Sequence, residues 1–120
     1  MTPGFVSFPR QGVSVQVDIA ESPEELARGL MGRTELDEMG GMLFWLGTRT
    51  NHVFTMRRTR IPLDLIFLDY DRVVGVLSLQ PTEGDGHQIH RPSTTVLEVN
   101  GGFAARHDVK VGDRVVVSLA

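Results

Sequence analysis

Apolar and polar residues alternate along residues 13–19. Val13, Val15, Val17 and Ile19 are apolar, and polar side chains stand between them. A period of two residues is typical of a β-strand that buries one face and exposes the other to water. We therefore predict a strand over this segment.

Further apolar runs predict more strands. Residues 65–68 are apolar without interruption, which indicates a strand buried on both faces. Residues 70–72 have the polar character of a hairpin turn between two such runs. The predicted strands after the first are residues 42–46, 52–57, 63–68, 73–79, 94–99 and 114–119.

Two short helices are predicted between these strands. Ser22 can cap the first helix, with Pro23 in its first turn and Glu25 closing a capping box. Its apolar stripe includes Leu30, and Gly32 stands where a left-handed C-terminal cap would end it. The second helix is predicted to begin after Asn100, which can cap it, and to run to about residue 107.

These elements predict an α+β fold that is mostly β. We expect one domain over residues 1–120, built as a compact barrel-like antiparallel or mixed sheet with two short helices. Residues 1–10 contain Pro3, Gly4 and Pro9, and we interpret them as an irregular N-terminal arm. Residues 81–92 are rich in turn formers and predict an exposed loop, long enough to act as a lid.

Composition and charge narrow the classes of function. The chain is 41% hydrophobic and contains no cysteine, so its core is expected to form without a disulfide, and cysteine-based metal sites are excluded. The net charge of −3 disfavours nucleic acid as a partner. No apolar run is long enough to span a bilayer, which predicts a soluble protein without a transmembrane segment. The compartment stays open, because a removed signal segment would allow export.

Three pairs of segments, in order along nearly the whole chain, resemble a known family. The segments are residues 28–33 with 41–44, residues 54–56 with 61–67, and residues 96–103 with 110–113. Together they are similar to the prokaryotic family of uncharacterised proteins numbered one-ninety-two among the domains of unknown function. The resemblance implies a compact, β-barrel-like domain and no established reaction.

The chain departs from that family in its middle segment. The family typically has a tryptophan, a lysine and an asparagine where this sequence has Thr55, Arg57 and Arg58. Many members also carry cysteines in the loop that corresponds to residues 81–92, where this chain has none. Roles that depend on those side chains therefore do not transfer. The resemblance also implies export or membrane anchoring as one option.

A basic segment is the first candidate for binding. Arg57, Arg58 and Arg60 lie close together in the sequence, and guanidinium groups suit bidentate contact with carboxylate or phosphate. On a strand, Arg58 and Arg60 would share one face and Arg57 the other. A solvated turn with surface ion pairs is the more common arrangement for such a segment.

Two carboxylates are the candidates for acid–base chemistry. Asp64 precedes a buried strand, so its carboxylate needs a charged or hydrogen-bonding partner, and Arg33 is the partner we expect. Structural pairing is the more common role of such a group. Glu98 and Asn100 point to the same side if their strand continues. Asp64 and Glu98 could form a hydrolytic pair if they meet in space.

Metal and apolar sites are less favoured by the pattern. His87 and His90 lie in a glycine-rich loop rather than on a helix, so neither a metal nor another cofactor is expected. Gly84 and Gly86 belong to a turn that lacks the spacing of a phosphate loop. Six residues could line an apolar pocket, although core filling is the more common role. They are Met31, Met42, Phe44, Trp45, Phe54 and Met56.

Three functional hypotheses follow. The first is a binding domain that takes a small polar or anionic ligand, or a protein tail, in a recess near Arg33 and Met56. The remaining residues assigned to this recess are Phe54, Arg58, Asp64 and Asn100. The second is a hydrolase in which Asp64 and Glu98 act as acid and base and Arg58 stabilises negative charge. The third is an interaction protein that presents a flat apolar patch over residues 44–46.

Overall fold

The fold consists of one seven-stranded sheet with two short helices. The computed structural model describes residues 1–120. The strands are β1 Thr2–Phe8, β2 Val13–Ala20, β3 Gly40–Thr50, β4 Leu63–Asp69, β5 Arg72–Leu79, β6 Ser93–Asn100 and β7 Val116–Leu119. The two helices are α1 Pro23–Arg28 and α2 Phe103–Arg106, and one 3-10 turn, η1, spans Pro81–Glu83. The prediction of a mostly-β fold with two short helices is confirmed.

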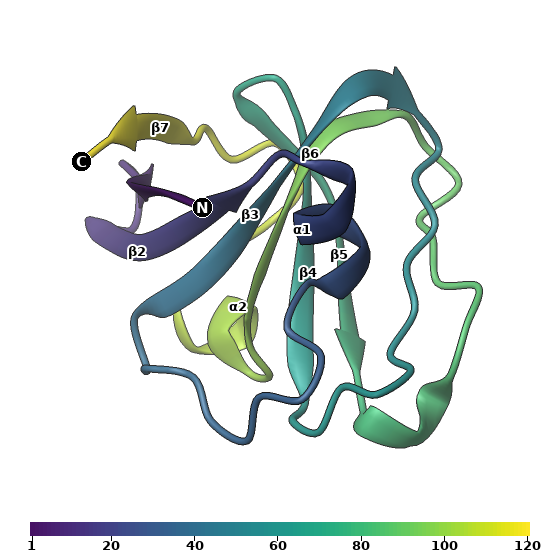
Figure 1. Ribbon diagram of the computed structural model, residues 1–120. Helices are drawn as coiled ribbons and strands as arrows, with labels where there is room; N and C mark the ends of the chain where they lie inside the picture. The colour runs from purple at the N-terminus through teal and green to yellow at the C-terminus, as the bar shows by residue number, and fades with distance from the viewer.

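The sheet is mixed and strongly curved (Figure 1). Its strand order is β5-β4-β6-β3-β2-β1-β7. All neighbouring strands are antiparallel except β2 and β3, which are parallel. Parallel neighbours require a crossover connection, and here α1 and residues 29–39 supply it.

The expectation of a barrel is only partly right, because the sheet is open. β5 and β7 are its two edges, and no continuous ladder joins them. The segment before β7 nevertheless reaches β5 through an isolated bridge between Arg72 and Arg114. The amide of Val73 also donates to the Asp113 carbonyl at 2.9 Å. The sheet therefore curls until its edges touch at one end, without closing.

The two faces of the sheet carry two separate hydrophobic clusters. The first core cluster consists of Val6, Phe8, Val15, Val17, Ile19, Leu43, Ile66, Leu68, Val73, Leu97, Val99, Phe103, Ala104, Val109 and Val115. The second core cluster consists of Ala20, Leu30, Met42, Phe44, Met56, Ile61, Leu63, Leu65, Phe67, Leu79 and Val96. Alternate residues of β4 enter different clusters, so this strand is buried on both faces, as its uninterrupted apolar run predicts.

The sequence-based interpretations of residues 1–10 and 52–57 are wrong. Residues 1–10 are not an irregular arm, because β1 pairs along its length with β2 and also with β7. Its buried residues Val6 and Phe8 alternate with more exposed neighbours. Residues 52–57 do not form a strand and make only one isolated bridge, between Phe54 and His87. Segments 51–62 and 80–92 therefore run side by side without joining the sheet (Figure 1).

The first helix begins as predicted but ends earlier. Ser22 and Glu25 form the capping box, and Pro23 is the first helical residue. The helix ends at Gly29, whose φ of 49° is in the region that favours glycine, rather than at Gly32. Leu30 consequently lies beyond the helix, where it is buried in the second core cluster.

The second helix is capped by a distant residue. Its N-cap is Gly102, which has no side chain to accept a hydrogen bond. The carboxylate of Asp64 accepts from the Gly102 and Ala104 amides instead, and Asn100 points to a different loop. The predicted Asn100 cap is therefore wrong. Neither helix is long and apolar enough to cross a lipid bilayer.

Candidate functional site

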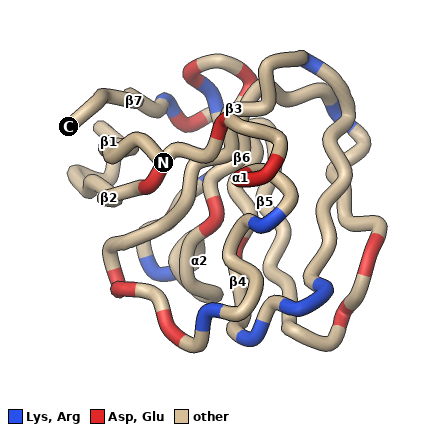
Figure 2. The backbone as a smooth tube through the Cα atoms, viewed as in Figure 1, with Lys and Arg blue, Asp and Glu red and all other residues tan.

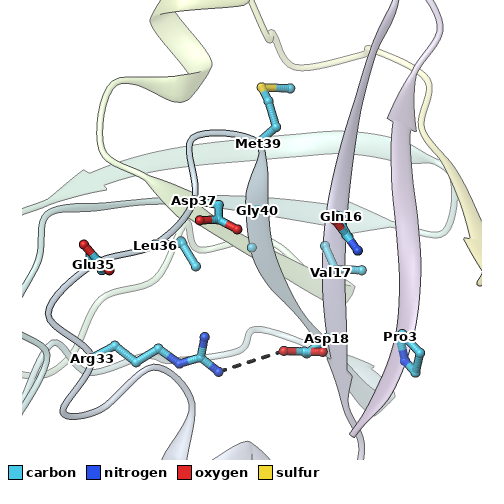
Figure 3. A pocket seen from close by; sticks show the side chains of 11 residues that line it. Pro3, Gln16, Val17, Asp18, Arg33, Glu35, Leu36, Asp37, Met39 and Gly40 are labelled. Atoms are coloured by element: carbon cyan, nitrogen blue, oxygen red, sulfur yellow. Dashed lines mark ion pairs between the residues drawn. The ribbon is translucent and has the colours of Figure 1, made fainter.

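A charged recess lies where the loop after α1 passes over the beginning of β3. Its volume is about 490 Å³. β2 and the beginnings of β1 and β3 form one side, and residues 33–39 form the other (Figure 3). We call this the Arg33 recess. The polar residues that line it are Gln16, Asp18, Arg33, Glu35 and Asp37.

Opposite charges face one another across the Arg33 recess. The guanidinium of Arg33 reaches toward Asp18, and their closest N–O distance is 3.9 Å (Figure 3). The side chains are 41% and 47% exposed, so water screens this ion pair. Glu35 and Asp37 add two further carboxylates to the lining. The recess thus combines one guanidinium with three carboxylates.

Two glycines keep the beginning of β3 open to the recess. Gly40 and Gly41 present no side chain on either face. A Cβ on Gly41 would lie 2.5 Å from the Glu98 carbonyl oxygen, so only glycine allows β3 to approach β6 this closely. The Gly40 amide donates to the Asp37 carbonyl at 2.9 Å, which closes the turn that leads from the loop into the strand.

Two further candidates from the sequence hold this loop in place. The side-chain amide of Asn100 donates to the carbonyl oxygens of Leu36 and Asp37 at 2.8 and 3.1 Å. The Arg58 carbonyl accepts from the Gly32 amide at 2.9 Å. Asn100 through its side chain and Arg58 through its backbone therefore position the loop that carries Arg33.

Phe54 and Met56 do not line the Arg33 recess. Met56 is 1% exposed and belongs to the second core cluster. Phe54 packs edge-on against Phe44 and Phe67, with ring centroids 5.4 and 5.8 Å away. Both residues hold segment 51–62 to the core.

Asp64 lies on the opposite face of the sheet from Met56 and Leu63. It is fully buried and accepts hydrogen bonds from Gly102 and Ala104, at 3.2 and 2.9 Å. Arg33, the partner expected from the sequence, pairs with Asp18 instead. Backbone amides therefore satisfy this carboxylate, and the predicted ion pair is wrong.

Glu98 is buried on the other side from Asp64. On β6 it stands opposite Met42 of β3 and Leu65 of β4, and both neighbours belong to the second core cluster. Asp64 stands opposite Val99, a residue of the first core cluster. Burial raises the pKa of Glu98 to about 8. Because the sheet separates the two carboxylates, they do not form the acid–base pair of the hydrolase hypothesis.

The basic segment is partly engaged with the loop beside it. Arg57 forms an ion pair with Asp85, which also accepts a hydrogen bond from the Thr55 hydroxyl. Arg58 has a φ of 60°, and Arg60 is exposed. The basic segment 57–60 and the acidic loop segment 83–85 thus lie at neighbouring positions on the molecule (Figure 2).

The expected lid is attached to the rest of the protein. Phe54 and His87 exchange backbone hydrogen bonds of 2.8 and 3.0 Å, and Ile89 packs against the second core cluster. His87 also contacts the Glu83 carbonyl through its ring nitrogen at 3.1 Å. No three His, Asp or Glu side chains gather with the geometry of a metal site.

Sequence reasoning missed the acidic side of the Arg33 recess. Gln16 and Asp18 occupy polar positions of the strand predicted over residues 13–19. The alternation of apolar and polar residues therefore predicts that both side chains point away from the core. Glu35 and Asp37 belong to a loop, where no periodicity indicates direction. Only the crossing of that loop over β2 and β3 brings the four side chains together.

Comparison with known proteins places the chain among structures of similar shape. A crystal structure of a protein of unknown function from Novosphingobium aromaticivorans is 38% identical, with a TM-score of 0.85. The match covers 95% of this chain and 83% of that one. A proposed transcription regulator from Sinorhizobium meliloti is 26% identical, with a TM-score of 0.84 over 97% of this chain and 92% of that one.

The family comparison agrees with the resemblance seen in the sequence. No curated protein matches the chain. The model of the family DUF192, described as Uncharacterized ACR, matches residues 6–117. This match includes all seven strands at least in part, together with the Arg33 recess apart from Pro3. The chain therefore belongs to the DUF192 family.

Proposed function

We propose that this protein is a binding domain whose ligand occupies the Arg33 recess. The observation that supports the proposal is the convergence of one guanidinium and three carboxylates in a recess of about 490 Å³. That volume is within the range of small-molecule sites. The ligand is a small molecule that carries a carboxylate and cationic nitrogen, as a basic amino acid does.

The charges in the recess suit such a ligand. Arg33 presents a planar guanidinium that can bind a carboxylate through two parallel hydrogen bonds. Asp18 and Asp37 offer acceptors to an ammonium group. Three carboxylates against one guanidinium leave two excess negative charges, which favour a ligand with cationic groups over a purely anionic one.

The existing ion pair does not oppose binding. Arg33 and Asp18 are 3.9 Å apart and substantially exposed, and pairs of this kind contribute roughly 0–1 kcal/mol. A ligand that pairs with both groups can therefore replace their mutual contact at little cost. The Asn100 side chain and the Arg58 carbonyl both bind the backbone of the loop of residues 32–37, which reduces the ordering required on binding.

Hydrolysis and transcriptional regulation have weaker support. A hydrolase based on Asp64 and Glu98 lacks its pair, since the sheet lies between them. The name of the Sinorhizobium relative suggests transcriptional regulation for that protein. For this chain, the net charge of −3 disfavours direct contact with DNA phosphates.

Calorimetric titration with three probes tests the proposal. Free lysine carries both charge types, cadaverine lacks the carboxylate, and succinate lacks the cationic nitrogen. We expect lysine to bind more tightly than cadaverine, and cadaverine more tightly than succinate. Tighter binding of succinate than of lysine, or no heat of binding with any probe, would contradict the proposal.

Variants then test which residue binds the carboxylate of the ligand and which binds its cationic nitrogen. Arg33→Ala should reduce the affinity for lysine to that for cadaverine, because only the carboxylate contact is lost. Asp18→Asn should weaken lysine and cadaverine alike. Arg91→Ala is the matched control, since it removes an exposed arginine outside the recess. Equal lysine affinities of the Arg33→Ala and Arg91→Ala variants would exclude the assigned role.

A further inference from the structure

We propose that a second recess, lined by the only tryptophan and the only tyrosine of the chain, binds the apolar face of a neutral saccharide ring. This aromatic recess has a volume of about 460 Å³ and contains Trp45 and Tyr70. It shares no lining residue with the Arg33 recess, so the two sites are independent.

The two aromatic rings have free surface. Trp45 is 48% exposed and Tyr70 is 72% exposed. Neither ring packs against another aromatic side chain, in contrast to the phenylalanines of the core. Burying a large aromatic ring removes a large apolar area from water, which is favourable. Tryptophan and tyrosine also each carry one polar group that can form a hydrogen bond. Two such rings at one recess are therefore available to a ligand with a flat apolar face.

Irregular backbone places these rings at the recess. The pairing of β3 with β6 shifts register between Trp45 and Thr50, and Gly47 within this stretch has a φ of 79°. Tyr70 lies in the β4–β5 hairpin turn with a φ of 54°. The Tyr70 amide donates to the Thr94 hydroxyl at 2.9 Å, which holds the turn against β6.

The rest of the lining combines apolar surface with hydroxyl groups. Val115, which is 3% exposed, and Val117 supply the apolar part. Thr48 adds a hydroxyl group that can donate and accept hydrogen bonds, whereas the Thr94 hydroxyl already accepts from the Tyr70 amide and donates to the Leu68 carbonyl at 3.3 Å. A pyranose ring has the complementary chemistry, because it carries C–H groups on its faces and hydroxyl groups around its edge.

The charges at the aromatic recess favour a neutral ligand. Arg49 donates two hydrogen bonds of 2.9 Å to the carboxylate of Asp69. Asp71 is paired with Arg114 at 4.0 Å. The two arginines near the aromatic recess are therefore each already paired with an aspartate. A phosphate or an organic cation would have to compete with these pairs, whereas a saccharide would not.

Tryptophan fluorescence tests the proposal directly, because Trp45 is the only tryptophan of the chain. The probes are cellobiose and maltose, with choline as the cationic comparator and phenol as the purely aromatic one. We expect at least one disaccharide to shift the emission to shorter wavelength in a saturable manner, while choline and phenol do not. A saturable shift with choline or phenol alone, or no shift with either disaccharide, overturns the proposal.

Two variants separate ring stacking from other effects. Tyr70→Asn keeps a residue type that tolerates positive φ, and it should weaken disaccharide binding roughly tenfold. Trp45→Ala, followed by calorimetry, should weaken it at least as much. Val111→Ala removes an exposed apolar side chain outside the recess and should leave binding unchanged. Unchanged affinity in both aromatic variants overturns the proposal.

One variant distinguishes disaccharide binding at the aromatic recess from lysine binding at the Arg33 recess. Arg33→Ala should abolish the advantage of lysine over cadaverine and leave the disaccharide response of Trp45 intact. If Arg33→Ala removes the disaccharide response as well, the aromatic recess is not a separate site and the inference fails.

Discussion

The carboxylate of Asp64 and the backbone amide of Ala104 form a hydrogen bond of 2.9 Å across 40 positions of the sequence. The same carboxylate accepts from the Gly102 amide at 3.2 Å. These contacts satisfy two amides at the beginning of α2 that no capping side chain of its own can reach. The residue singled out for catalysis thus acts as a distant helix cap.

Asp64→Ala should lower the free energy of unfolding by about 2–3 kcal/mol, because the Gly102 amide and the buried Ala104 amide both lose their acceptor. Asp64→Asn should cost less, since one side-chain oxygen remains. Urea denaturation measures both. Asp71→Ala, which removes an exposed aspartate, is the control. A midpoint for Asp64→Ala equal to that of the control would contradict this role.

Glu98→Gln should change how stability depends on pH. Burial raises the pKa of Glu98 from an ordinary 4.5 to about 8. Between these values the folded state binds more protons than the unfolded state, so the stability of the native protein falls as pH rises from 4.5 toward 8. The neutral glutamine removes this loss.

We therefore expect Glu98→Gln to be more stable than the native protein by several kcal/mol at about pH 9, and to show a flatter pH profile. Thermal unfolding across pH measures this difference. Glu38→Gln, at an exposed glutamate, should keep the native profile. Parallel profiles for Glu98→Gln and the native protein would show that Glu98 does not titrate with a raised pKa.

Asp113→Asn should remove stability that the native protein loses in acid. Arg10 donates hydrogen bonds of 2.8 and 2.9 Å to the two carboxylate oxygens of Asp113. These bonds hold the pKa of Asp113 well below its usual value of 3.8. The resulting stability is fully present above pH 3.8 and disappears as pH falls below it. The variant should therefore be less stable at neutral pH and lose less stability on acidification.

The partner residue provides the check on this assignment. Arg10→Gln should destabilise the protein in a similar way, and the double variant should be little worse than either single variant. Thermal unfolding at neutral and acidic pH measures all three. Additive losses would mean that Arg10 and Asp113 act independently.

Gly41→Ala should destabilise the fold by roughly 2 kcal/mol or more, because its Cβ would lie 2.5 Å from the Glu98 carbonyl oxygen. The contact is with backbone, so relief requires β3 and β6 to separate. Gly40→Ala is the matched control, since its nearest atom is the Asp37 Cβ at 3.1 Å. We expect a smaller stability loss there, measured by urea denaturation. Equal stability of the two variants would contradict the steric argument.

Local pattern was sufficient for most of the strands. The alternation over residues 13–19 and the apolar run over residues 65–68 each report a burial environment that repeats along the strand. The capping box of Ser22 and Glu25 is likewise local, because its contacts span three residues. These elements can therefore be predicted from residues that are close together in the sequence.

Local pattern failed where pairing is long-range. β1 contains Pro3 and Gly4, which weaken a strand signal, yet its register with β2 and its position beside β7 make it part of the sheet. Residues 52–57 look strand-like but find no continuous partner. Strand formation needs a second chain segment, so the identity of that segment decides the outcome.

The sequence by itself determined the family, the mostly-β class and the alternating faces of individual strands. Tertiary structure alone decided that Asp64 and Glu98 lie on opposite sides of the sheet and that Arg33 meets Asp18. It also brought Trp45 and Tyr70 to one recess. The physical reason is that side-chain direction within a strand follows from a local period of two, whereas the meeting of two side chains depends on register and loop path.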